Sequence, residues 1–276
     1  VNFGGQVNVS GKYYLTVTVS EYIGGTYYLQ DSSSFTKLFT LGSGGGGGGG
    51  AIPGLPIGGT DGPDRLEGTN SAEQIFGYAG NDFVRGYAGN DTIYGGAGQD
   101  SVSAGYGADI IYGGSGNDLL PGQDGNDKVY GGTGNDNIGG NTGHDYLSGG
   151  AGRDFLFGDH GGTGAGRDTL IGGRGQDVLY GGRGADRFVF QSVDDAKVFG
   201  SVRTDVANTL REEIADFSHR DGDLIVLRAI DANTRVGGDQ AFSFIGGAAF
   251  SGRAGQLRFA NEMLMGDIND DRRADF

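Results

Sequence analysis

Apolar residues recur every nine positions between Gly59 and Val189. Nine-residue units begin at 59 and follow without a slip to the unit at 149; five extra residues, Gly158–Gly162, precede three more units at 163, 172 and 181. A flexible linker would not be expected to have an apolar residue at the eighth position of all fourteen units. These eighth positions are Leu66, Ile75, Val84, Ile93, Val102, Ile111, Leu120, Val129, Ile138, Leu147, Leu156, Leu170, Leu179 and Phe188.

The polar positions of the units are equally regular. Position four is Gly in every unit except at Ser71, and position six is Asp in every unit except at Glu73. Gly with Asn or Asp is typical of turns, and a β-branched residue or Leu is typical of a strand. We therefore expect a six-residue turn followed by a three-residue strand. The position-six aspartates are Asp64, Asp82, Asp91, Asp100, Asp109, Asp118, Asp127, Asp136, Asp145, Asp154, Asp168, Asp177 and Asp186.

One unit cannot bury its single apolar side chain, whereas stacked units share a continuous core. That core is narrow, and a column of thirteen carboxylates repels itself. Bound cations would neutralise the carboxylates and add to the stability that the narrow core lacks, because carboxylates and backbone carbonyls are hard oxygen ligands. A solenoid that binds no metal is the alternative, and its stacked carboxylates would be costly.

Composition narrows the function classes. The chain of 276 residues has a net charge of −15, with 29 Asp against 6 Glu, 61 Gly and no Cys. Phosphate neutralisation in nucleic-acid binding needs a basic face, so nucleic acid is not an expected partner. We expect no membrane span, because no apolar run reaches 18 residues. Without Cys, disulfides and Cys-based zinc sites are excluded.

The unit GG-x-G-x-D-x-U-x, where U is apolar, resembles the calcium-binding nonapeptide of RTX proteins. Clear copies are residues 113–121, 131–139 and 172–180. The resemblance implies an all-β fold, a right-handed parallel β-roll over 59–189 with two units per turn. It also implies Ca²⁺ between the turns of units i and i+2, held by the Asp carboxylates and backbone carbonyls. We expect roughly 8–10 ions.

Residues 190–276 differ in composition and are expected to form a C-terminal β cap. Strands are predicted at 223–230, 241–246, 255–260 and 262–265, and 205–216 has the pattern of a short helix. The run Ile214-Ala215-Asp216-Phe217, the segment Asp221–Ile225 and the segment 249–259 resemble the C-terminal module of serralysin-type secreted metalloproteases. That resemblance implies export by a type I secretion apparatus.

Residues 266–276 resemble a D-x-N-x-D calcium loop. The oxygen ligands would be Asp267, Asn269, Asp271 and Asp275. The loop departs from the usual pattern, because Arg272 stands where Gly makes the sharp turn and no acid occupies position twelve.

Residues 1–41 are expected to form a small β element of no family we can name, followed by a Gly-rich linker at 42–58. Strands are predicted at 7–9, 14–19, 27–29 and 35–41. Val1 opens no signal-peptide pattern, so we expect a processed chain or an excerpt of a longer protein.

No catalytic constellation is expected. The three His residues, His144, His160 and His219, form no H-E-x-x-H motif, so the zinc centre of a metalloprotease is missing from this chain. There is no G-x-S-x-G and no Cys nucleophile. The adjacent acids Asp194-Asp195 and Glu212-Glu213 are expected to be solvated rather than catalytic.

Two functions are compatible with these patterns. In the first, the chain is the calcium-binding module of an exported, extracellular protein that folds on calcium after type I secretion. In the second, it is a structural protein that self-associates into a surface layer or fibre, with strands of residues 1–41 adding to a neighbour's sheet. Deleting residues 1–50 distinguishes them, because only the second function predicts loss of assembly.

Overall fold

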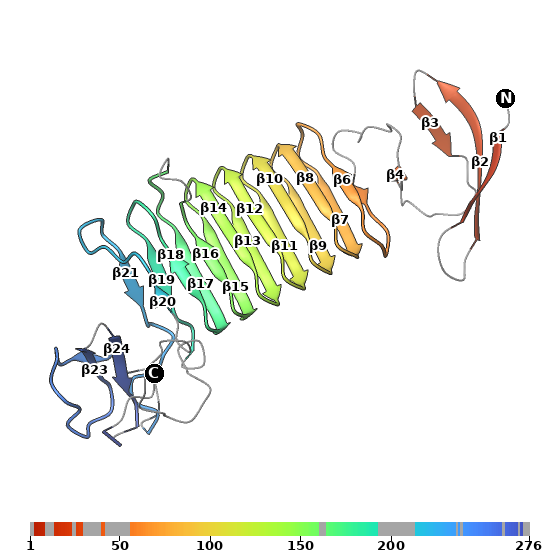
Figure 1. The fold of residues 1–276 in the computed structure, drawn as a ribbon. Helices are drawn as coiled ribbons and strands as arrows, with labels where there is room; N and C mark the ends of the chain where they lie inside the picture. Colours follow the sequence, from red (N-terminus) through yellow and green to blue (C-terminus); the bar gives the residue numbers. More distant parts are fainter. Residues whose placement is uncertain are drawn as a thin grey trace. The chain divides into compact units, whose positions relative to one another are not determined.

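The computed structural model describes residues 3–8, 14–23, 26–29, 40–41, 56–159, 164–192, 213–235, 237, 240–260, 263–269 and 271–272. Within these residues every regular element is a strand, which confirms the all-β fold class. The chain divides into two compact units, Val1–Leu38 and Phe39–Phe276. Figure 1 shows the second unit as a stack of parallel strands followed by a small sheet.

Two parallel sheets form a β-roll, and consecutive strands along the chain alternate between them (Figure 1). One sheet consists of β6 (Arg65–Glu67), β8 (Phe83–Ala88), β10 (Ser101–Tyr106), β12 (Leu119–Asp124), β14 (Asn137–Thr142), β16 (Phe155–Phe157), β18 (Val178–Tyr180) and β20 (Glu213–Ile214). The other consists of β4 (Thr40–Leu41), β5 (Ile57–Gly58), β7 (Gln74–Ala79), β9 (Thr92–Ala97), β11 (Ile110–Ser115), β13 (Lys128–Thr133), β15 (Tyr146–Gly152), β17 (Thr169–Gly175), β19 (Arg187–Val189) and β21 (Leu224–Val226).

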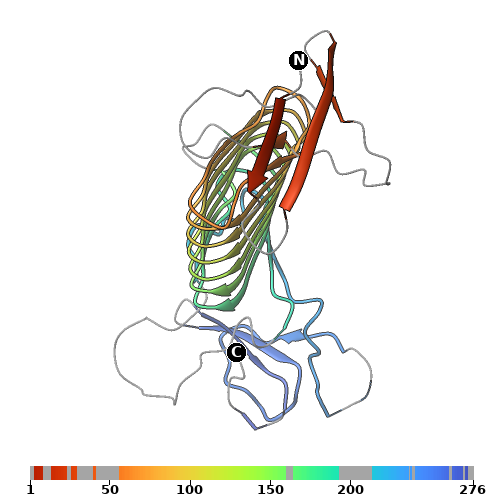
Figure 2. The same ribbon diagram turned by 90° about the vertical axis from the view of Figure 1, so that its right-hand side faces the viewer.

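The register of the sheets confirms two units per turn. In β11 and β13, Ile111 pairs with Val129, and in β8 and β10 Val84 pairs with Val102, an offset of 18 residues in both cases. Figure 2 shows the two sheets lying face to face and joined by the turns.

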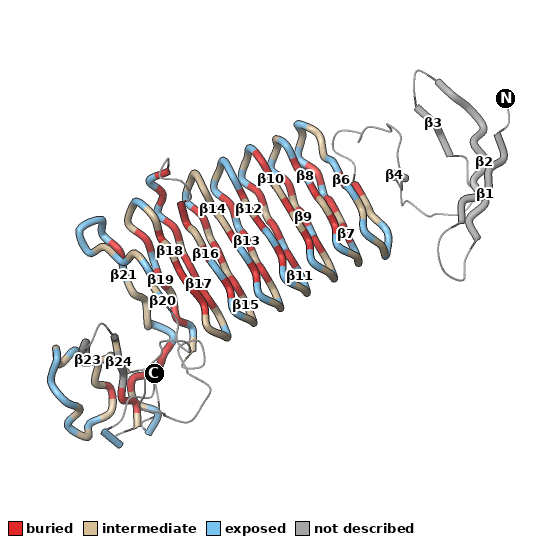
Figure 3. Tube along the Cα trace, in the orientation of Figure 1, coloured by how far each residue is buried: buried red, intermediate tan, exposed pale blue. Residues whose placement is uncertain are grey.

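The core is the predicted column of apolar side chains. All fourteen position-eight residues are buried, from Leu66 at 4% exposure to Phe188 at 0%. Figure 3 shows buried stretches along the successive strands of the roll. Because one aliphatic side chain per nine residues fills the space between the sheets, this apolar core is continuous but narrow.

The division of each unit into strand and turn differs from the prediction. Strands β7 to β14 are six residues long rather than three, and they run from position seven through position three of the next unit. The ladder continues because position two takes a positive φ: Gly96 has φ 113° and still pairs with Gly114 across the sheet. Three residues remain for the turn, of which the position-four Gly also has a positive φ, 127° at Gly116.

The insertion at 158–162 lies inside a unit and not between two units. Gly158 takes position one, because a Cβ there would collide with Asp168 Oδ2 and the Gly181 carbonyl, as at other position-one glycines. The five extra residues therefore fall between Asp159 and Gly166, and the register across β15 and β17 lengthens to 23 residues.

The sheets continue beyond residue 189. Strands β20 and β21 pair with β18 and β19 and place Ile214 and Ile225 against the core. The helix expected over 205–216 is therefore wrong at Glu213–Ile214, where the apolar Ile214 takes up a position-eight place in the roll. Residues 205–212 lie outside the described part.

Side-chain ladders line the outside of the roll. Phe76, Tyr94, Tyr112 and Tyr130 stack with ring centroids 5.0–5.1 Å apart. At position five, Asn side chains accept the N–H of the residue 18 positions later, as Asn81 Oδ1 does from Gln99 at 2.8 Å. Stacked rings and Asn ladders link successive turns.

Two small sheets complete the described structure. Three antiparallel strands, β1 (Phe3–Asn8), β2 (Tyr14–Ile23) and β3 (Thr26–Leu29), form the first unit. The C-terminal sheet consists of β22 (Ser243–Phe244), β23 (Gln256–Ala260) and β24 (Met263–Asp267). Strand β4 belongs to the roll instead, and the glycine run at 42–50 lies outside the described residues.

Gly116→Ala tests the tight stacking of the turns. A Cβ there would collide with the Gly98 carbonyl, and φ is 127°, so we expect a loss of at least about 1–2 kcal/mol. Thermal unfolding in calcium measures it. Gly237→Ala is the control, because a Cβ at Gly237 meets nothing within 4 Å. Equal unfolding temperatures for both variants would contradict the packing described.

Candidate metal centre

The position-six acids form two rows along the roll, one at each edge where the strands turn. Each unit contributes one acid, and successive units alternate between the rows. One row is Asp64, Asp82, Asp100, Asp118, Asp136, Asp154 and Asp177; the other is Glu73, Asp91, Asp109, Asp127, Asp145, Asp168 and Asp186.

From Asp82 and Asp91 onward, one oxygen of each position-six aspartate accepts a hydrogen bond from the preceding turn of its row. Asp100 Oδ1 accepts the backbone N–H of Asp82 at 2.9 Å, and Asp127 Oδ1 accepts that of Asp109 at 2.8 Å. The same bond recurs along both rows. The carboxylates are therefore fixed in orientation by the backbone of the neighbouring turn.

The other oxygen points into the turn and is buried. A Cβ built on Gly95 would stand 2.6 Å from both Asp100 Oδ2 and the Gly113 carbonyl oxygen, so carboxylate and carbonyl oxygens converge there. Ala104 occupies position one of its unit, so it has a methyl group where Gly95 has only a hydrogen atom, and it is buried. The Oδ2 atoms that are buried without a hydrogen-bond partner include those of Asp82, Asp91, Asp100, Asp109, Asp118, Asp127, Asp136, Asp145, Asp154, Asp168 and Asp186.

Without a cation, burial raises the pKa of these carboxylates above the ordinary value for Asp. Burial raises the pKa of Asp127 and Asp154 to about 7 and that of Asp168 to about 8, from an ordinary value of 3.8. The N–H donated to each carboxylate opposes the rise, and the carboxylates of neighbouring turns add to it. A buried anion beside other anions favours its neutral form.

The first two turns differ from the others, because Thr at position two contacts their acid. Thr60 Oγ1 donates to Asp64 Oδ2 at 2.9 Å, and Thr69 bonds both oxygens of Glu73. Asp64 is also only partly buried. The hydroxyls thus stabilise these two carboxylates with groups of the chain itself.

Two acids beyond the predicted set take part in the same arrangement. Asp223 Oδ1 accepts the N–H of Asp186 at 3.0 Å and so extends one row by a turn. Asp216 accepts the N–H groups of Gly181 and Gly182 at 2.9 and 2.8 Å. The spacing of Asp223 to Ile225 follows the D-x-U pattern, a signal that the interrupted nine-residue phase obscured.

The predicted loop at 267–275 has a turn-like structure held by its own side chains. Asp267 Oδ1 accepts the N–H of Asn269 at 3.2 Å, and Asn269 Oδ1 accepts that of Asp271 at 3.0 Å. Arg272 takes φ 66°, the conformation for which Gly is usual. Asp275 lies outside the described residues, and calcium binding by this loop stays a prediction.

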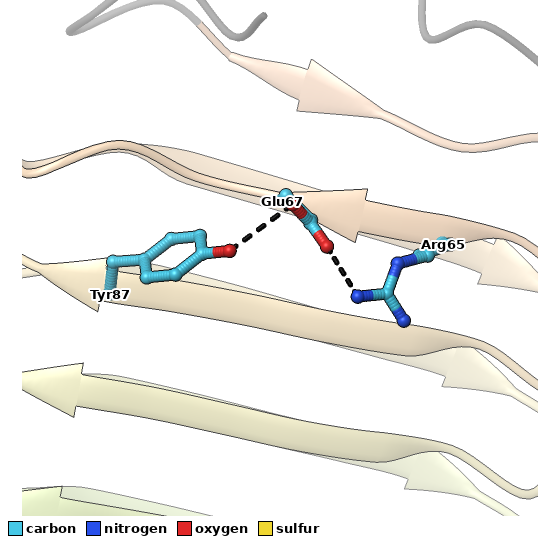
Figure 4. A network of polar contacts seen from close by, with 3 residues as sticks. All are labelled: Arg65, Glu67 and Tyr87. Carbon is cyan, nitrogen blue, oxygen red and sulfur yellow. Dashed lines mark hydrogen bonds and ion pairs between the residues drawn. The ribbon is translucent and has the colours of Figure 1, made fainter. Parts of the chain in front are cut away.

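An acid on the outer face of the roll shows the contrast with the buried rows. Glu67 pairs with Arg65 at 2.6 Å and accepts a hydrogen bond from the Tyr87 hydroxyl at 3.1 Å (Figure 4). These two partners lower the pKa of Glu67. This exposed charge is compensated by the chain itself, whereas the buried Oδ2 atoms are not.

The residues of the turns fit a divalent cation with oxygen ligands. Among the described residues no three Asp, Glu, His or Cys side chains gather around one point. A cation in a turn would therefore take a minority of its ligands from carboxylates and the others from converging backbone carbonyls. Ca²⁺ accepts such a mixed oxygen set, and its charge would offset the buried carboxylates.

A comparison with protein families agrees with this chemistry. The profile of the RTX calcium-binding nonapeptide repeat matches residues 58–92, 67–102, 85–120, 103–138, 139–161 and 163–195. No curated protein matches the chain. Within the part of the chain that the structure describes, no helix has the length and apolar character needed to cross a membrane.

The raised pKa values predict an acid-stabilised roll in the absence of metal. The folded chain binds more protons than the unfolded chain between about pH 4 and 8, so the metal-free roll loses stability as pH rises through this window. In metal-depleted solution, far-ultraviolet circular dichroism should show more β structure at about pH 5.5 than at about pH 8.

Calcium-saturated protein is the control, because bound Ca²⁺ takes the place of the protons and the roll should then not lose stability as pH rises. The apparent affinity of the chain for Ca²⁺ should increase with pH over the same window, since Ca²⁺ and protons compete for the carboxylates. Metal-free β structure that grows as pH rises would contradict the burial of unpaired carboxylates.

Proposed function

Because the chain belongs to the RTX calcium-binding nonapeptide repeat family through residues 58–195, we propose that it is the calcium-binding β-roll module of an exported, extracellular protein. The observation that carries the proposal is the double row of buried carboxylate oxygens without partners. A module with so many unpaired buried oxygens needs a countercharge to be stable.

The position-six aspartates from Asp82 to Asp186 are the proposed ligands. Each would supply Oδ2, which is buried without a hydrogen-bond partner at residues such as Asp100 and Asp127, and backbone carbonyls such as that of Gly113 would complete the oxygen set. The Oδ2 of Asp64 accepts hydrogen bonds from the backbone N–H and the hydroxyl of Thr60, so the role of Asp64 as a ligand rests on the sequence pattern alone. The bound cation supplies charge compensation and holds adjacent turns together, which is a structural role.

The proposed role of calcium is to control folding by mass action. Inside a cell calcium is scarce, and a chain with a net charge of −15 whose acids must be buried stays unfolded. Modules in extracellular settings bind calcium at roughly 10⁻⁴–10⁻³ M. There the binding free energy becomes folding free energy. An unfolded chain inside the cell is compatible with passage through a type I secretion apparatus, the proposed partner.

The roll itself is a structural, calcium-binding fold and not a catalytic one. Its buried acids face the interior of the turns, and each Oδ1 is engaged by backbone. An enzymatic part, if the parent protein has one, would lie outside this solenoid.

A calcium titration of the metal-depleted chain tests the proposal. We expect circular dichroism to change from a coil-like to a β spectrum near millimolar calcium, since binding and folding are coupled. Light scattering recorded in the same titration detects assembly, the alternative function. Full β structure at neutral pH in excess chelator would overturn the proposal.

Asp100→Asn tests a single ligand. The variant keeps an oxygen to accept the Asp82 N–H but loses the buried charge, so it should lose about 1–3 kcal/mol of calcium-dependent stability. The thermal midpoint in calcium measures the loss. Asp61→Asn, at an exposed position, carries the same charge change and should leave the midpoint unchanged. Equal midpoints for the two variants would argue against Asp100 as a ligand.

A further inference from the structure

The insertion places a carboxylate where no other turn of the roll has one. Position two is Gly in seven units, and in the interrupted unit that begins at Gly158 it is Asp159. Asp159 stacks directly beneath the position-two residue of the next turn, because a Cβ on Gly182 would stand 2.6 Å from the Asp159 Cβ.

Asp159 is buried, and one of its oxygens is unpaired. Its exposure is 8%, and its Oδ2 accepts the N–H groups of Gly166 and Arg183 at 3.3 and 3.2 Å. Its Oδ1 has no hydrogen-bond partner. These bonds fix the carboxylate in place and leave one oxygen facing the turn.

A backbone oxygen converges on the same place. A Cβ built on Gly164 would collide with Asp159 Oδ1 and stand 2.9 Å from the Asn141 carbonyl oxygen. Asn141 belongs to the turn of Asp145, whose Oδ2 is also buried and unpaired. Burial raises the pKa of Asp145, and the charge of Asp159 adds to the rise.

We propose that Asp159 is an additional carboxylate ligand, and that Asp159 and the turn of Asp145 together form a calcium site, here called the insertion site, tighter than the regular turns. The inference rests on the proposed function, because it assumes calcium in the turns. Affinity of oxygen sites for Ca²⁺ rises with the number of charged ligands. The insertion site therefore fills first as calcium increases, and it starts folding of the roll from this turn.

Calorimetric titration of the full, metal-depleted chain with calcium alone tests the site. The wild type should show a tight class of sites ahead of the main class, by about tenfold or more in affinity. Asp159→Asn should lose that tight class and keep the others. The amide retains an oxygen that can accept the N–H groups of Gly166 and Arg183.

Two further variants make the test decisive. Asp124→Asn removes an exposed carboxylate close enough to raise the pKa of Asp127, so it controls for charge near the row and should keep the tight class. Asp159→Gly installs the residue that other units carry at position two and should fold in calcium without the tight class, which guards against a variant that fails to fold.

The outcomes separate this site from the proposed function. If Asp159→Asn and Asp159→Gly both give the wild-type isotherm, Asp159 is not a ligand and the inference is wrong, although calcium binding by the roll stands. If Asp124→Asn also loses the tight class, long-range charge explains the effect and the inference is again wrong. If the wild type itself binds no calcium, the proposed function fails as well.

Discussion

The structure depends on buried carboxylates that belong to one turn and accept a hydrogen bond from the backbone of the turn before it. One oxygen accepts a backbone N–H from the turn before, as Asp118 does from Asp100, and this bond links adjacent turns of the roll. The carboxylate that makes this bond is buried in the turn, where its second oxygen, Oδ2, has no hydrogen-bond partner. A fold that uses anions as its connecting elements must neutralise them, either with protons or with cations.

The thin core makes this dependence strong. Each nine-residue unit buries one aliphatic side chain, such as Ile111 or Val129, while it orders eight other residues, many of them glycine. In a thicker solenoid, apolar packing would tolerate some uncompensated charge. Here the hydrophobic contribution per unit is small, so the state of the turn carboxylates decides whether the roll is stable.

The nine-residue period was enough to predict the apolar core and the recurrence of one acid per unit, because both depend only on spacing. The pairing of the acids of units i and i+2 was implied by the resemblance to RTX repeats. It did not predict six-residue strands, since glycine-rich segments have low β propensity and the ladder passes through residues such as Gly96 with positive φ. Asp159 and Asp223 were also missed. Their places depend on where the insertion lies and on pairing across 23 or more residues, which local spacing cannot show.

The two ends of the roll explain where calcium is needed. At the turns of Asp64 and Glu73, the hydroxyls of Thr60 and Thr69 donate hydrogen bonds to the carboxylates. At the last turns, Asp216 caps the N–H groups of Gly181 and Gly182. Asp216 caps only N–H groups, and Asp186 Oδ2 of the same turn is buried without a partner. The calcium dependence of the roll therefore begins after the first two turns, extends to the turn of Asp186 and grows with the number of turns.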